Sequence, residues 1–210
     1  MARLGGAPGP RAAPERATDD TVLVIGVHRA ELAFGDAVAA GLADRPLTVF
    51  RIPHGIRRAT TAPGARFYSL AEHHEIYLQL AQQIGGRPRL LLDLHRGVDE
   101  AGRGADLFCH HAGFLRAVER RLRGGEPGGP VRLLRILDEH APAEAAAGRE
   151  FEAAAHTWIP RAVWAARRPL YVGLEIYLPA EGRGNRADWA FARGLVDLVC
   201  AAGDRAGDVA

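Results

Sequence analysis

Short apolar runs alternate with amphipathic stretches along most of this chain. The run TVLVIGV at residues 21–27 is rich in β-branched residues and apolar on both faces, which is typical of a central parallel strand covered on both sides. Similar runs predict further strands at residues 46–52, 87–95, 105–111, 131–137 and 168–178. Helices are expected between the strands, at residues 31–42, 69–84, 112–123, 142–166 and 185–202.

This alternation predicts an α/β fold, with three layers (α/β/α) and a mostly parallel mixed central sheet. A chain of 210 residues has the length of a single domain with a sizeable core. We expect that domain to span residues 21–202. The segment 1–20, rich in Pro, Gly, Ala and Arg, is expected to be a disordered lead-in, and residues 203–210 a flexible tail.

The composition argues against several classes of partner. The formal net charge is only +2, and the arginines are scattered rather than clustered, so no nucleic-acid partner is expected. The N-terminal segment has no apolar run, so no secretory signal is predicted. No window of 18 residues is continuously apolar, so no membrane span is predicted. The two cysteines are too few for a disulfide framework. We therefore expect a cytoplasmic protein.

Three of the predicted strands carry potential metal ligands near their carboxyl ends. His28 and Glu31 follow the first strand, Asp93 and His95 close the strand at 87–95, and Glu175 lies inside the last strand. In open parallel sheets, functional groups gather beyond the carboxyl ends of the strands. Side chains far apart in the sequence are therefore expected to meet at one edge.

These residue types suit one kind of chemistry. Two histidines and one carboxylate can hold a catalytic zinc ion and leave a fourth position open for water. The bound water then ionises near neutral pH and acts as a nucleophile. A second carboxylate away from the metal is needed as general base.

The local positions of the acidic residues fit this interpretation. Glu31 falls in the first turn of a predicted helix, where the helix dipole favours a carboxylate. Asp93 lies two residues before His95 in a strand, so both side chains point to the same face and Asp93 can orient the histidine ring. Glu175, in an apolar strand, costs several kcal/mol to bury unless a partner such as a cation offsets that cost.

Taken in order, the motifs GVHRAE, LLDLH and YVGLEIYLP resemble the zinc metallocarboxypeptidase superfamily. The likeness is greatest to its succinylglutamate desuccinylase and aspartoacylase deacylase branch, and the N-formylglutamate amidohydrolase branch stays open. The resemblance implies that His28, Glu31 and His95 bind zinc (Zn2+) and that Glu175 is the general base. It also implies an amide hydrolase that acts on a small N-acyl amino acid or a carboxylate-bearing peptide.

The chain departs from that family in two ways. The separation of His28 from His95 is short, and the asparagine–arginine pair that grips a substrate carboxylate is absent between the motifs. Arginine binds a carboxylate with two parallel hydrogen bonds. The candidates for this contact are Arg57, Arg58 and Arg66 in the loop at 53–67. His111, at the end of the strand at 105–111, is a further residue that could line the site.

Less specific interpretations stay open. His73 and His74 in the helix at 69–84 read as part of an exposed polar face, and Cys109 as a small buried strand residue. The whole chain could also be a metal-free α/β binding protein whose histidines and glutamates coincide by chance. A further alternative is a degenerate superfamily member that binds zinc without turnover.

Overall fold

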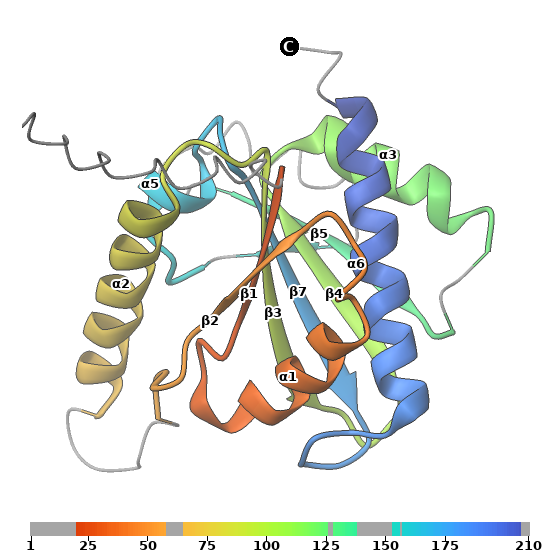
Figure 1. Cartoon of the computed structure of the whole chain (residues 1–210), viewed down its shortest axis with the longest axis horizontal. Helices are drawn as coiled ribbons and strands as arrows, with labels where there is room; N and C mark the ends of the chain where they lie inside the picture. Colours follow the sequence, from red (N-terminus) through yellow and green to blue (C-terminus); the bar gives the residue numbers. More distant parts are fainter. Residues whose placement is uncertain (1–19, 58–64, 126–127, 138–152, 156, 207–210) are drawn as a thin grey trace, which may run out of the picture.

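The computed structural model describes residues 20–57, 65–125, 128–137, 153–155 and 157–206 (Figure 1). Its strands are β1 (Thr21–Ile25), β2 (Thr48–Arg51), β3 (Leu90–Val98), β4 (Gly104–Cys109), β5 (Val131–Ile136), β6 (Ala153–Ala155) and β7 (Leu170–Leu178). Its helices are the short 3-10 helix η1 (Arg29–Glu31), α1 (Leu32–Ala40), α2 (Ala65–Ile84), α3 (Ala112–Leu122), α5 (Arg161–Trp164) and α6 (Arg186–Ala206).

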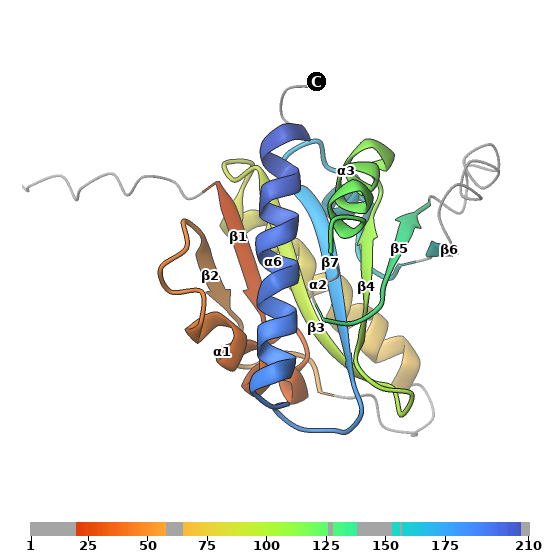
Figure 2. The same ribbon diagram turned by 90° about the vertical axis from the view of Figure 1, so that its right-hand side faces the viewer.

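The described strands form one seven-stranded sheet in the order β2-β1-β3-β7-β4-β5-β6. Neighbouring strands run parallel throughout, except that β4 is antiparallel to β7. Helices α1, α3 and α6 cover one face, and α2 and α5 cover the other (Figures 1 and 2). The predicted three-layer α/β/α fold with a mostly parallel mixed sheet is confirmed.

The apolar core is divided between the two faces of the sheet. Leu92 and Leu94 of β3 pack in a cluster with residues of α1, α3 and α6, whereas Leu91 packs in a second cluster with residues of α2 and α5. Because side chains of a strand alternate between faces, Asp93 and His95 lie on the face covered by α2. The polar residues of the candidate site thus share the smaller of the two apolar layers.

Several elements differ from the sequence-based expectation. The predicted helix at 142–166 is wrong where the chain is described, because residues 153–155 form the edge strand β6 and the only helix there is the short α5. Strand β3 continues past His95 to Val98, and α6 continues to Ala206, inside the expected tail. The expected lead-in, apart from Asp20, and residues 207–210 lie outside the described part of the chain.

None of the described helices has both the length and the apolar character needed to cross a membrane.

Candidate metal centre

A tight turn at the end of β1 delivers His28 to the edge of the sheet. Gly26 has a φ of +83°, a left-handed conformation that glycine adopts without steric cost. A Cβ atom at this position would lie 2.6 Å from the carbonyl oxygen of Ile52, so no larger residue fits. The chain then forms an isolated parallel bridge between His28 and Ile56, and η1 follows directly and carries Glu31.

The candidate site lies where β3 extends beyond the end of the neighbouring strand β1. The last residue pair between β1 and β3 joins Ile25 to Leu94, so His95 is the first residue of β3 beyond β1. Glu31 fills the space next to it, and its Oε2 accepts a hydrogen bond from the backbone N–H of Arg96 at 3.3 Å. The premature end of β1 therefore brings Glu31 and His95 together.

Three predicted ligands converge at this point. One potential ligand atom from each of His28, Glu31 and His95 lies within 4.8 Å of the other two. Nδ1 of His95 is 3.1 Å from Oε2 of Glu31, and the ring centroids of His28 and His95 are 5.2 Å apart. The side chains of Glu31 and His95 are only 14% and 12% exposed, so water screens this group weakly.

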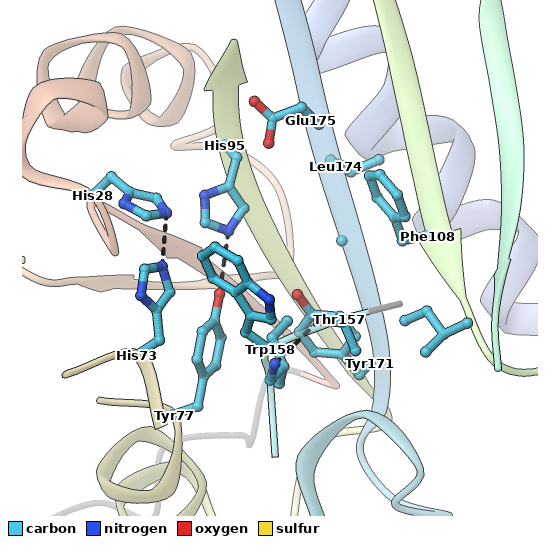
Figure 3. Close-up of a pocket in the computed structure, with 13 residues that line it drawn as sticks. His28, His73, Tyr77, His95, Phe108, Thr157, Trp158, Tyr171, Leu174 and Glu175 are labelled. Atoms are coloured by element: carbon cyan, nitrogen blue, oxygen red, sulfur yellow. Dashed lines mark hydrogen bonds between the residues drawn. The ribbon is translucent and has the colours of Figure 1, made fainter. Parts of the chain in front are cut away.

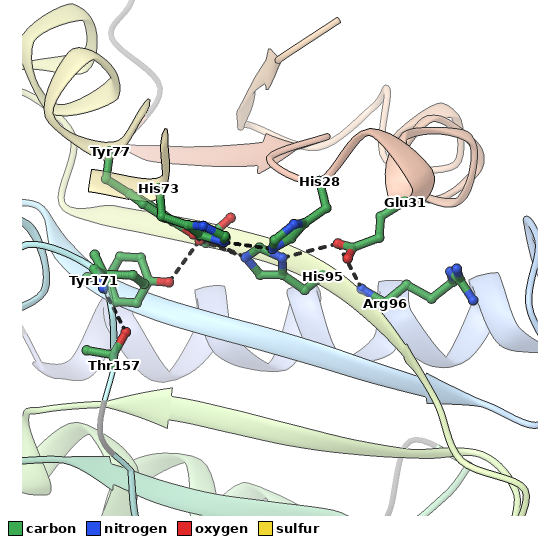
Figure 4. A network of polar contacts seen from close by, with 10 residues as sticks. His28, Glu31, His73, Tyr77, His95, Arg96, Thr157 and Tyr171 are labelled. Carbon is green, nitrogen blue, oxygen red and sulfur yellow. Dashed lines mark hydrogen bonds and ion pairs between the residues drawn. The ribbon is translucent and has the colours of Figure 1, made fainter. Parts of the chain in front are cut away.

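Asp93 holds the opposite edge of the His95 ring. Its Oδ2 lies 3.0 Å from Nε2 of His95 and accepts hydrogen bonds from the hydroxyls of Tyr77 at 2.5 Å and Tyr171 at 2.8 Å. Figure 4 shows Tyr77 and Tyr171 on one side of the His95 ring and Glu31 on the other. An N–H on Nε2 that donates to Asp93 leaves the lone pair on Nδ1, which faces Glu31.

Burial and neighbouring charges shift the pKa values of His28, Asp93 and His95 in different directions. Burial lowers the pKa of His28, although nearby Glu31 opposes the shift, so its ring is neutral at pH 7. Burial alone would raise the pKa of Asp93, but His95 and the hydrogen bonds hold it below its usual value. Burial alone would lower the pKa of His95, yet Asp93 and Glu31 raise it well above 6.5, so a cation here must displace a proton.

Glu175 lies beside His95 on the same face of the sheet. The two residues are register partners between β3 and β7, and Asp106 of β4 is the partner of Glu175 on the other side. Burial raises the pKa of Glu175 to about 7, and the charges of Glu31, Asp93 and Asp106 add to the shift. Figure 3 shows its carboxylate next to His95, at the rim of a cavity.

This cavity has a volume of about 250 Å³. His28, His73, His95 and Glu175 form its polar part. The rest is mainly aromatic and aliphatic, with contributions from Tyr77, Phe108, Ile136, Trp158, Ile159 and Tyr171 (Figure 3). A mostly apolar pocket with a few convergent polar groups is the usual form of a small-molecule site.

The proposed substrate-binding residues do not gather around this cavity where the chain is described. Arg57 is exposed and does not line it, Arg58 lies outside the described residues, and Arg66 belongs to α2 in a stretch whose side chains the structure does not describe. No described arginine is among the cavity residues.

The expectation that His111 lines the site is not met. Because β4 runs antiparallel to β7, its carboxyl end lies at the edge of the sheet away from the ends of β1 and β3. His111 is exposed there and caps α3, with its Nδ1 accepting a hydrogen bond from the backbone N–H of Phe114 at 3.0 Å.

Three residues near the candidate metal ligands were not assigned to the site from the sequence. Tyr77 and Tyr171 hold Asp93, and His73, expected on an exposed face, is instead buried, with its Nε2 3.3 Å from Nε2 of His28. His74 is exposed, as expected. The spacing of His73 and Tyr77 places them one helical turn apart, and this is the signal that could have assigned both to the buried face of α2.

Comparison with known proteins gives only distant structural likenesses. No protein family model matches the chain. No curated protein matches it either. A mutant form of murine aminoacylase 3 is similar at 15% identity and a TM-score of 0.45, over 88% of this chain and 62% of that one. This chain thus spans about three fifths of the length of that aminoacylase.

Two amidases show a similar degree of likeness. The CwlD amidase from Clostridioides difficile, solved with the GerS lipoprotein, is 11% identical with a TM-score of 0.44, over 86% of this chain and 98% of that one. The catalytic domain of CwlV, an N-acetylmuramoyl-L-alanine amidase from Bacillus (Paenibacillus) polymyxa var. colistinus, is 12% identical with a TM-score of 0.43, over 88% and 97%. At such low identity, function has to be argued from the geometry of the site.

Proposed function

We propose that this chain is a zinc-dependent hydrolase of amide bonds. The observation that carries the proposal is the convergence of His28, Glu31 and His95, whose potential ligand atoms lie within 4.8 Å of one another. Glu175 stands beside this group, as the register partner of His95. Two imidazoles and one carboxylate match the protein ligands of catalytic zinc sites, which keep one further position for water or substrate.

The donor set fits the ion in its chemistry as well as its spacing. His28 is neutral at pH 7 because burial lowers its pKa, and neutral imidazole is the form that binds metals. Asp93 fixes the ring of His95 from the far side, as carboxylates behind metal-bound histidines commonly do. A zinc ion held here would act as a Lewis acid on a carbonyl oxygen and would lower the pKa of water.

Glu175 is the residue that moves protons in this proposal. As a carboxylate it takes a proton from the attacking water while the new C–O bond forms. As an acid it returns that proton to the nitrogen that leaves when the C–N bond breaks. Without an ion, burial raises the pKa of Glu175 to about 7. The positive charge of a bound zinc ion would lower that pKa and favour the carboxylate, the form that accepts the proton.

The proposed substrate is a small N-acyl amino acid or a carboxylate-bearing peptide. The cavity of about 250 Å³ has room for its apolar portion, since a cavity of about 150 Å³ lined by apolar side chains can hold benzene. The contact to the substrate carboxylate is assigned to Arg58 or Arg66, in the segment whose side chains the structure does not describe.

The proposal is tested by hydrolysis of N-formyl, N-acetyl and N-succinyl amino acids by protein purified without a histidine tag. We expect about one zinc per chain, loss of activity with a chelator, and recovery when zinc is restored. The variant Glu175→Gln should keep its zinc but lose activity by about 10²- to 10⁴-fold, whereas His74→Ala, on the exposed face of α2, should behave as the unaltered chain.

The outcome also separates the alternatives. Rates that do not change after zinc removal would contradict a metal-dependent mechanism. Absence of bound zinc would favour a metal-free binding protein. Bound zinc without any activity that depends on Glu175 would indicate a degenerate member that holds the ion without turnover.

A further inference from the structure

We propose that His73 of α2 is a fourth protein ligand of this metal centre. The inference rests on the proposed function, since it concerns the same ion. It adds a residue outside the three motifs that point to zinc. The centre would then have three imidazoles and one carboxylate, instead of two imidazoles and one carboxylate.

The packing of α2 brings His73 to the site. Its side chain is only 9% exposed and lines the same cavity as His28, His95 and Glu175. One helical turn further on, the Tyr77 hydroxyl donates to Asp93, which ties this face of α2 to the strand that carries His95. Trp158 packs edge-on against His73, with ring centroids 5.8 Å apart, and so limits movement of the ring away from the site.

The distance between the two imidazoles matches a shared ion. Nε2 of His73 lies 3.3 Å from Nε2 of His28. Two nitrogens bound to one tetrahedral zinc ion at about 2.0–2.1 Å are separated by about 3.3 Å. The 3.1 Å between Nδ1 of His95 and Oε2 of Glu31 is of the same size.

The direction of His28 supports the same assignment. In Figure 3 the nitrogen of His28 that faces His73 is also the nitrogen turned toward His95. The two Nε2 atoms lie within hydrogen-bond distance, and in such a pair one imidazole nitrogen donates while the other accepts. An ion bound to Nε2 of His28 would use the lone pair of that nitrogen, so no hydrogen could remain there. The ion would then lie between the two rings in place of the hydrogen.

His73 is the outermost of the four donors. It is not one of the three described residues whose ligand atoms all lie within 4.8 Å of one another. We therefore expect its removal to weaken zinc binding rather than abolish it. With four protein donors, a zinc ion held here would bind water or substrate only as a fifth ligand, a coordination number that zinc can reach.

The test compares His73→Ala with His74→Ala, a neighbouring histidine on the exposed face of the same helix. X-ray absorption spectra of the zinc-loaded proteins count the imidazoles around the ion, and chelator competition measures zinc affinity. We expect three imidazoles in the unaltered chain and in His74→Ala, and two in His73→Ala. Loss of a residue that supports a metal ligand typically costs about 10- to 100-fold in affinity, and His73→Ala should lose at least that much.

A second variant guards against a folding defect. His73→Gln keeps a polar side chain of similar size, and circular dichroism of the metal-free protein checks that it folds. It should show the same loss of one imidazole. The affinity alone would also fall if His73 merely oriented His28, so the imidazole count is the deciding measurement.

The result that overturns the inference leaves the proposed function standing. Two imidazoles in the unaltered chain, with zinc bound and hydrolysis intact, would remove His73 from the ligand set. A chain that binds no zinc at all would overturn the hydrolase proposal and this inference together.

Discussion

At the scale of the residue, the burial of the Glu175 carboxylate is the clearest case in which an energetic cost indicates a chemical role. Its carboxylate lies in a largely apolar layer. In the sheet, Glu175 is the register partner of His95 on one side and of Asp106 on the other. Burial raises its pKa from 4.5 to about 7. A structural carboxylate would be matched by a permanent cation, whereas a proton-transfer residue benefits from this intermediate pKa.

The raised pKa has a consequence for the stability of the metal-free protein. Because the folded-state pKa of about 7 exceeds the unfolded value of 4.5, the folded state holds a proton between these values that the unfolded state has lost. The contribution of Glu175 to stability is therefore fully present below pH 4.5 and declines as the pH rises to about 7.

Glu175→Gln removes this pH dependence. The free energy of unfolding of the variant should exceed that of the unaltered chain by up to about 3 kcal/mol above pH 7, and the difference should shrink toward zero at pH 4.5. Urea unfolding of both metal-free proteins across this range measures it. A difference that does not change with pH would show that folding does not raise the pKa of Glu175.

At the scale of the element, the site depends on how closely β3 and β7 approach beyond the end of β1. Gly97 of β3 lies opposite Tyr177 in the register. A Cβ atom at Gly97 would lie 2.9 Å from Oε1 of Glu175 and 2.8 Å from the ring of Tyr177. The missing side chain at this position leaves the space that the Glu175 carboxylate occupies.

Gly97→Ala should therefore move Glu175, the proposed general base, without touching the proposed zinc ligands. We expect kcat/KM to fall by about 10- to 100-fold, because a displacement of about 1 Å in a catalytic group can cost this much, while zinc affinity is unchanged. Gly104→Ala in β4 is the matched control, since its Cβ would meet nothing closer than 3.4 Å. Equal activity in both variants would mean that the position of Glu175 is not limiting.

At the scale of the whole molecule, the candidate metal centre lies between two segments that already meet through strand pairing and a hydrogen bond from Arg96 to Glu31. His28 and Glu31 follow β1, and His95 lies in β3, so an ion shared by them cross-links the edge of the sheet. A ligand that binds only the folded state stabilises it in proportion to the logarithm of its concentration.

Zinc at about 100 times its dissociation constant should add about 2.7 kcal/mol to the free energy of unfolding. For a domain of this size that corresponds to a rise in Tm of about 5–10 °C. Differential scanning calorimetry with zinc and with a chelator measures the shift. His28→Ala should abolish most of it, and an equal shift in His28→Ala would place the zinc somewhere else on the chain.

The sequence by itself determined the fold class and the positions of most strands and helices. The continuous apolar runs at β1, β3 and β7 could be read locally, because strands buried on both faces need such runs wherever they lie in the sheet. The same local pattern placed His28, Glu31, His95 and Glu175 at or near strand ends, and the structure brings these four side chains to one edge.

Only the tertiary structure decided which other side chains surround the candidate site. A buried strand has the same apolar pattern whether it runs parallel or antiparallel, so the reversed direction of β4, which carries His111 away from the site, could not be read from the sequence. The burial of His73 had only one local signal, its position one helical turn before Tyr77, because packing selects the buried face of a helix of mixed polarity such as α2. Contacts between segments distant along the chain are set by packing, which no single segment encodes.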